Sequence, residues 1–240
     1  MDRDRLAANY KAVIARGAAA AARAARAGRV GRVGRAGDAW RLVAVTKTVT
    51  AEVAAALTEL GAGDLGENRV DELLRKKEAL AGRQVRWHLI GHLQTNKVKK
   101  VVGAADLIGG VDSIRLAEEI ERVASAREVR QDILLEVNIS GEESKYGLSP
   151  GAAAEAAAQL GNLPHVRLRG LMTMAPIVAN AEETRPVFRG LRELAERIAA
   201  GGHFAEGRWE LSMGMTQDFE IAIEEGATLI RVGSALFEGV

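Results

Sequence analysis

The chain alternates between short, nearly continuous apolar runs and longer segments with apolar residues at three- and four-residue spacing. The spaced segments, such as EVAAALTELG, IRLAEEIERVASA and ETRPVFRGLRELAERIAA, predict amphipathic helices. Near-continuous apolar runs are typical of parallel strands covered on both faces. Beyond residue 40 the predicted strands are RLVAVTK (41–47), GDLGEN (63–68), VRWHLIG (85–91), ADLIGGVDS (105–113), DILLEVNIS (132–140), VRLRGLMTM (166–174), RWELSMG (208–214) and TLIRVGSAL (228–236).

Eight strands with seven intervening helices and a leading helix predict an α/β protein with a closed, TIM-like (β/α)₈ barrel. A doubly wound open sheet is the alternative. The barrel is favoured because the strand count is eight and no GxGxxG follows the first strand. We expect one domain over residues 1–240, in which 1–40 form the leading helix and a loop rich in arginine and glycine.

Composition narrows the function classes. The chain has 240 residues, 48% hydrophobic and 27% charged, with a formal net charge of +1. No global field therefore favours nucleic acid or an acidic partner. It contains no cysteine, which excludes disulfides, thiolate metal sites and a cysteine nucleophile. We expect no signal peptide and no membrane span, and a cytoplasmic location.

The segment from Arg16 to Arg41 departs from this balance, with seven arginines and one acidic residue. Its alanine-rich first part is expected to continue the opening helix to about Arg26, and GRVGRVGRAG to form a loop. One interpretation is a weak patch that binds nucleic acid or another polyanion. A solvated surface loop is favoured, because no aromatic residue is interleaved for base stacking.

Lys47 ends the first predicted strand and so faces the barrel mouth, where such folds carry their chemistry. Partial desolvation there would lower its pKa and free the amine for Schiff-base formation with a carbonyl. A surface lysine at a strand end is the alternative. The stretch 42–48 alone does not decide between them.

The loops after the last two predicted strands favour the first interpretation. Barrels often bind phosphate there. The seventh strand ends in LSMGMT with Ser212 and Gly214, and the eighth in IRVGSALFEG with Gly233 and Ser234. Glycine permits close backbone approach and the serines supply hydroxyl donors. Singly, each could be an ordinary turn residue. Together with a lysine that reacts with aldehydes, they predict a pyridoxal 5′-phosphate (PLP) site.

A set of long motifs in chain order carries a family resemblance over roughly residues 40–239. The motifs are AVTKT, GDLGENRVDEL, WHLIGHLQTNKVK, GGVDS, VNISGEESKYGL, LRGLMTM and LSMGMTQDFEIAIEEGATLIRVGSALFEG. With these, the chain resembles the PLP homeostasis protein family, single-domain relatives of the alanine racemase barrel. The first loop is longer and richer in arginine than expected for the family.

The resemblance implies PLP bound as an aldimine to Lys47, with phosphate contacts from Ser212 and the Gly233–Ser234 backbone. It also implies that Asn68 lies near the cofactor and that Arg231 approaches the pyridine nitrogen. An arginine only donates hydrogen bonds, so it would keep that nitrogen unprotonated and weaken PLP as an electron sink. The alternative for Arg231 is an ion pair with a carboxylate inside the barrel.

Other polar residues are weaker candidates. His88 and His92 have no accompanying ligand cluster, so no metal site is expected. We interpret His88 as a hydrogen-bonded barrel residue and His92 as a residue of a mouth loop. Lys145 follows the fifth strand and is either an ordinary loop lysine or a second amine near the cofactor.

Three functions remain open: a PLP carrier, a PLP-dependent racemase-like enzyme, and a class I aldolase. An aldolase would be colourless. A racemase needs a second base opposite the lysine, and the chain stops at Val240, just after the eighth strand, with Tyr10 and Tyr146 as its only tyrosines. We therefore expect a carrier that buffers PLP for vitamin B6 homeostasis without catalytic turnover. The expected partners are PLP and PLP-dependent apo-enzymes, with no nucleic acid and no membrane, and the protein is expected to be a monomer.

Overall fold

The computed structural model describes residues 1–26, 40–142, 145–207 and 209–240. Eight strands in this part of the chain pair in parallel and close into a barrel in sequence order. They are β1 (Arg41–Val45), β2 (Asp64–Glu67), β3 (Arg86–Leu89), β4 (Leu107–Val111), β5 (Gln131–Glu136), β6 (Val166–Met172), β7 (Glu210–Ser212) and β8 (Leu229–Val232). The predicted barrel is confirmed and the open sheet is wrong. Each strand is shorter than its apolar run, because the ends of the runs belong to loops.

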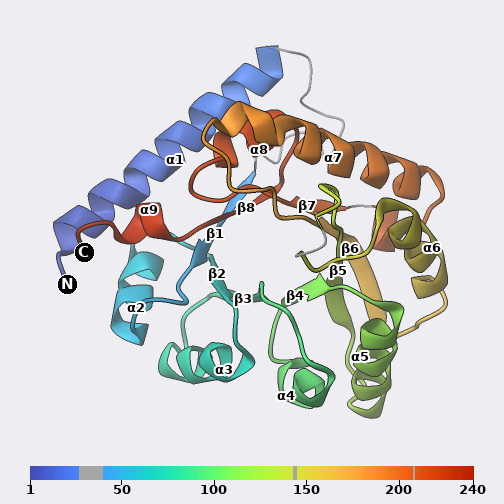
Figure 1. The fold of residues 1–240 in the computed structure, drawn as a ribbon. Coiled ribbons are helices and arrows are strands. Elements are labelled where there is room, and N and C mark those ends of the chain that lie inside the picture. Colours follow the sequence, from blue (N-terminus) through green and yellow to red (C-terminus); the bar gives the residue numbers. More distant parts are fainter. Residues whose placement is uncertain (27–39, 143–144, 208) are drawn as a thin grey trace.

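Helices surround the barrel (Figure 1). They are α1 (Arg3–Arg26), α2 (Ala51–Glu59), α3 (Val70–Ala79), α4 (Val98–Val101), α5 (Ile114–Ala126), α6 (Pro150–Leu160), α7 (Arg185–Ala200), α8 (Phe219–Glu224) and α9 (Ser234–Phe237), with 3₁₀ turns η1 (Thr95–Lys97), η2 (Ala181–Thr184) and η3 (Ala205–Gly207). Several begin at Ser or Thr caps, such as Ser113, whose Oγ accepts from Leu116 N.

The leading helix α1 ends at Arg26, as predicted. Its buried residues (Leu6, Val13, Gly17, Ala20 and Ala24) fall on one stripe, which packs against α8 and α9. A Cβ added at Gly17 would lie 2.2 Å from the Trp40 ring, so a larger residue there would displace that ring. The predicted loop GRVGRVGRAG lies outside the described residues.

Two apolar layers account for the near-continuous hydrophobicity of the strands. One lies between the sheet and the helices. The other fills the barrel interior with Val43, Leu107, Leu134, Met172 and Leu229. A strand with apolar neighbours on both faces has no reason to alternate with polar residues.

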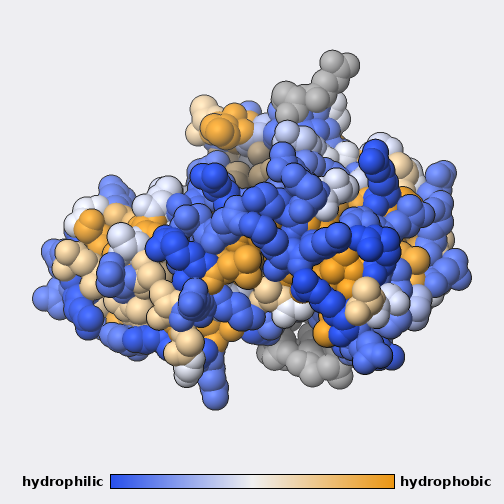
Figure 2. Space-filling view, turned by 90° about the horizontal axis from the view of Figure 1, so that it is seen from below, coloured by the Kyte–Doolittle hydropathy of each residue, from blue (hydrophilic) through white to orange (hydrophobic). Residues whose placement is uncertain are grey.

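The outer surface seen from the side of α3 and α4 is mostly hydrophilic, and hydrophobic residues show as separate patches (Figure 2). None of the described helices is both long and apolar enough to cross a membrane.

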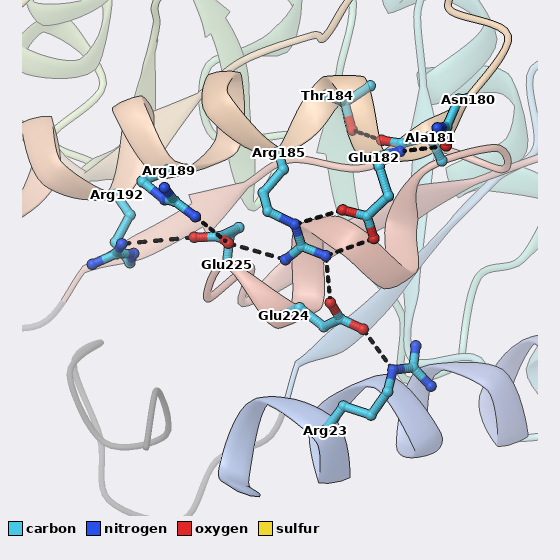
Figure 3. A network of polar contacts seen from close by, with 10 residues as sticks. All are labelled: Arg23, Asn180, Ala181, Glu182, Thr184, Arg185, Arg189, Arg192, Glu224 and Glu225. Carbon is cyan, nitrogen blue, oxygen red and sulfur yellow. Dashed lines mark hydrogen bonds and ion pairs between the residues drawn. The ribbon is translucent and has the colours of Figure 1, made fainter. Parts of the chain in front are cut away.

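A polar network joins α7 to α8 (Figure 3). Its centre is Glu225, whose side chain has 0% exposure. Glu225 Oε1 accepts from Arg185 Nη1 at 3.0 Å and from Arg189 Nη2 at 3.4 Å, and Arg192 Nη2 lies 3.7 Å from Oε2. A buried carboxylate is held here by cations from three successive turns of one helix, so α8 is fixed against α7.

The same network reaches α1 and η2. Arg185 Nη2 also donates to Glu224 Oε2 at 2.7 Å, and Glu224 Oε1 accepts from Arg23 Nε of α1 at 2.6 Å. Glu182 of η2 holds the other edge of the Arg185 guanidinium, through Nε and Nη2 at 2.8 Å each. Arg185 therefore bonds to Glu182, Glu224 and Glu225 at once and links η2, α7 and the end of α8.

Replacing Arg185 by alanine should lower the free energy of unfolding. We expect about 3 kcal/mol, the lower end for removing one partner of a buried ion pair, because Arg189 and Arg192 stay near Glu225. The matched control is Arg122→Ala, which removes an exposed pair with Glu119 on α5. It should leave the free energy of unfolding nearly unchanged, because solvent screens an exposed pair. Urea unfolding of both variants measures the difference, and equal values would contradict the role given to Arg185.

Candidate functional site

Lys47 lies in a turn at the C-terminal mouth of the barrel. β1 ends at Val45, so the prediction that Lys47 ends the strand is wrong by two residues. Val49 N donates to Thr46 O at 3.0 Å and closes a turn with Lys47 inside it. The Lys47 side chain is exposed, so the expected partial desolvation is not found either. A turn beyond the strand frees the side chain from the neighbouring strands that would have covered it.

Both neighbours of β1 bring predicted site residues to the same place. β1 pairs with β2 through Val45 and Gly66 and with β8 through Ala44 and Val232. Asn68 follows β2 and is exposed at the mouth. A Cβ on Gly233, just after β8, would lie 3.3 Å from Val45 O, so the loop after β8 rests against the end of β1. The chain thus places its first and last barrel loops side by side.

The loop after β7 is shaped by Gly214. Its φ is +89°, and an added Cβ would come within 2.5 Å of Ala222 Cβ, so a larger residue is excluded on both counts. Buried Asp218 closes the loop, because its Oδ1 accepts from Met215 N at 2.6 Å. Ser234 Oγ donates to Thr216 Oγ1 at 3.0 Å, which joins this loop to the one after β8.

Arg231 is the buried cation beneath these loops. Its Nη1 donates to Ser212 Oγ at 2.7 Å and its Nη2 to Thr173 O at 2.9 Å. Burial lowers the pKa of Arg231 to about 10, although Glu136 and Asp218 act in the opposite direction. The guanidinium stays protonated at neutral pH. Among the described residues it forms no ion pair, so the alternative of a carboxylate-paired Arg231 is wrong.

Glu136, at the end of β5, is a site residue that the sequence interpretation missed. It is 3% exposed, and it takes part in no ion pair among the described residues. Burial raises the pKa of Glu136, Arg231 lowers it, and Asp112 raises it further. An acidic residue inside the apolar run ILLEV (133–137) was the available signal. Arg231 and Glu136 therefore form a polar layer above the apolar barrel interior.

A second group of residues lines the mouth beside β3, β4 and β5. His92 Nδ1 lies 2.9 Å from Asp112 Oδ2, and the His92 ring stacks on Tyr146 with centroids 4.6 Å apart. Lys145 Nζ donates to Met174 O at 3.3 Å and lies 3.5 Å from Glu142 Oε1. The prediction that His92 belongs to a mouth loop is confirmed, and Lys145 also lies on the mouth side.

His88 lies deeper, inside the barrel, with Nε2 2.7 Å from Asp64 Oδ1, as expected for a hydrogen-bonded barrel residue. No group of three or more His, Cys, Asp or Glu side chains in the described ranges could hold a metal ion.

The sequence of the chain is similar to those of known proteins. The model of the alanine racemase N-terminal domain family matches residues 31–239. The pyridoxal phosphate homeostasis protein of Aquifex aeolicus is 45% identical, over 82% of this chain and 86% of that protein.

Two solved structures superpose closely. An unknown protein from Bifidobacterium adolescentis has 39% identity and a TM-score of 0.88, covering 98% of this chain and 95% of that one. PipY of Synechococcus elongatus with PLP bound has 34% identity and a TM-score of 0.77, covering 90% and 99%.

Glu136→Gln should stabilise the protein at neutral pH. The pKa of Glu136 is raised in the fold, so as pH rises past the unfolded value of about 4.3 the unfolded state loses the proton first. Wild-type stability therefore falls until pH exceeds the folded pKa, and the glutamine variant lacks this loss. Urea unfolding should show a more stable variant at pH 7 and no difference below about pH 4. A less stable variant at pH 7 would contradict the buried, unpaired position of this carboxyl.

Proposed function

Because the chain belongs to the pyridoxal phosphate homeostasis protein family, we propose that it binds PLP as a covalent aldimine on Lys47 and carries or buffers it for vitamin B6 homeostasis. The observation that carries the proposal is the contact of Gly233 with the end of β1. This contact puts an amine that can react with an aldehyde beside a loop with hydroxyl donors. PipY, whose structure holds PLP, supports the choice of cofactor.

The residues of the mouth fit the parts of PLP. Ser212, Thr216 and Ser234 offer hydroxyls at the ends of β7 and β8, and Gly214 and Gly233 let these two loops pack closely against α8 and the end of β1. Ser212 Oγ accepts from Arg231 and so still has its own proton to donate. Asn68, which follows β2, lies on the other side of the Lys47 turn from the loops after β7 and β8. We assign the phosphate to these two loops and the aldehyde to Lys47.

Arg231 supports a carrier better than an enzyme. Bound PLP supplies an aldehyde to amines and, in enzymes, an electron sink that a protonated ring nitrogen favours. Arg231 has a permanent charge and only donor groups, and hydroxyl and carbonyl oxygens hold it in the barrel. Opposite the ring nitrogen it would keep that atom unprotonated and leave the sink weak.

The positions of the two tyrosines also favour a carrier over a racemase. Tyr10 belongs to α1, outside the barrel, and its hydroxyl lies near Gly61 at the end of α2. Tyr146 lies at the mouth, stacked on His92 and 59% exposed. Tyr146 is therefore the tyrosine that a racemase-like activity would have to use, and its exposure gives it no fixed place above a cofactor.

We further propose an intracellular monomer whose partners are PLP-dependent apo-enzymes, without nucleic acid or membrane.

Lys47→Ala should abolish the visible absorption of the PLP-loaded protein and the pyridoxyl adduct fixed by borohydride, because no imine can form at the alanine. The fold should persist, since Lys47 is exposed. Peptide mapping after reduction identifies the labelled lysine. Lys47→Ala combined with Lys145→Ala tests whether any remaining label lies on Lys145. A wild-type adduct on another lysine alone would overturn the assignment, and a colourless wild-type protein would favour the aldolase.

The purified PLP-loaded protein should show negligible racemase, transaminase or decarboxylase turnover and should reactivate a PLP-dependent apo-enzyme. The assay follows the optical purity of D- and L-alanine in parallel with apo-enzyme reactivation. Rapid interconversion that disappears in both Lys47→Ala and Tyr146→Phe would make the protein an enzyme with two bases. Reactivation no faster than that by the same concentration of free PLP would argue against a carrier.

A further inference from the structure

We infer that the buried pair Lys76 and Glu67 positions Lys47, by fixing the carbonyl and the hydroxyl of Thr46. The inference rests on the proposed PLP site and extends it to two residues that do not themselves face the mouth. Lys76 belongs to α3 and Glu67 is the last residue of β2.

Thr46 is held on all sides. Its N–H donates to Gly66 O at 3.0 Å. Its carbonyl accepts from Val49 N at 3.0 Å, which closes the Lys47 turn, and from Lys76 Nζ at 2.6 Å. Its hydroxyl donates to Glu67 Oε1 at 2.6 Å. Both lone pairs of the carbonyl are used, so the peptide that leads into Lys47 has one orientation.

Lys76 and Glu67 also bond to each other. Lys76 Nζ lies 2.6 Å from Glu67 Oε1, and the two side chains are 1% and 0% exposed. Lys76 occupies the apolar stripe of α3 after Val70 and Leu73, where a leucine would ordinarily pack. Glu67 Oε2 has no partner among the described residues.

A buried ion pair is weak evidence for stability, since apolar residues of similar volume are often as stable. Packing alone therefore does not explain why a lysine of α3 is buried in the core at this position. The contacts of this lysine do explain it, because its amine bonds to the carbonyl of Thr46, which directly follows β1 and closes the Lys47 turn. Lys47 itself is exposed, so the direction of its long side chain depends on the backbone beneath it.

The test separates imine formation from binding of the rest of the cofactor. The variant carries Glu67→Met and Lys76→Met together, which removes both charges and keeps the volume. PLP affinity should fall about tenfold or more, the range for residues that orient a ligand group from behind. Affinity for pyridoxine 5′-phosphate, which has the ring and phosphate but no aldehyde, should not change. Fluorescence titration measures both, and urea unfolding confirms that the variant is folded.

The matched control is Asp64→Asn with His88→Gln, which breaks the buried pair at the opposite end of β2. It should leave affinity for both ligands unchanged. Thr46→Val provides a second variant if the methionine pair does not fold. It should lose PLP affinity selectively, and Thr46→Ser should restore it.

Three results would overturn the inference. They are equal losses for the two ligands, no loss for either, and an equal selective loss in the control pair. A wild-type protein that does not bind PLP would instead overturn the proposed function itself.

Discussion

Closure of the barrel between β1 and β8 is the contact on which the candidate site depends. Lys47 follows the first strand and Gly233–Ser234 follow the last, so almost the whole barrel sequence separates them. Their meeting requires the register that pairs Ala44 with Val232, and Gly233 then lies against Val45. An open sheet of the same strands would put these loops on opposite edges. The entropy of closing so long a loop is offset by the two apolar layers inside and outside the strands.

The barrel interior changes character toward the mouth. Apolar residues fill its middle, and above them Arg231 and Glu136 are buried without forming an ion pair with each other. Ser212 and the Thr173 carbonyl satisfy Arg231, which leaves its charge uncompensated by direct contact. The low-dielectric surroundings lower the pKa of Arg231 and raise that of Glu136.

The fold could be predicted from the sequence because the same pattern recurs along the chain. Eight apolar runs alternate with amphipathic helical segments, and each repeat indicates the same (β/α)₈ barrel. The motifs of the loops after β7 and β8 could likewise be recognised, because their residues are close together in the sequence. They are Ser212 with Gly214, and Gly233 with Ser234. The exposure of Lys47 could not be predicted, because an apolar run does not show where pairing stops and a turn begins. Lys76 was missed for a related reason. A lysine on a helix is ordinarily solvated, and its burial becomes evident only when Thr46 and Glu67 are placed beside it.

The leading helix α1, although outside the barrel, contributes to the side of the candidate site that the loops after β7 and β8 form. The loop between β7 and α8 is tied to Ser234 through Thr216 and closed by Asp218. Its downstream end is α8, and α1 holds that helix in two places. Arg16 stacks over the Phe219 ring at 4.7 Å and forms two bonds to Glu220, while Arg23 pairs with Glu224. A loop fixed at both ends and across its middle loses little further entropy when it binds an anion. The arginines of α1 thus hold α8, and with it one end of the loop between β7 and α8, without reaching the mouth themselves.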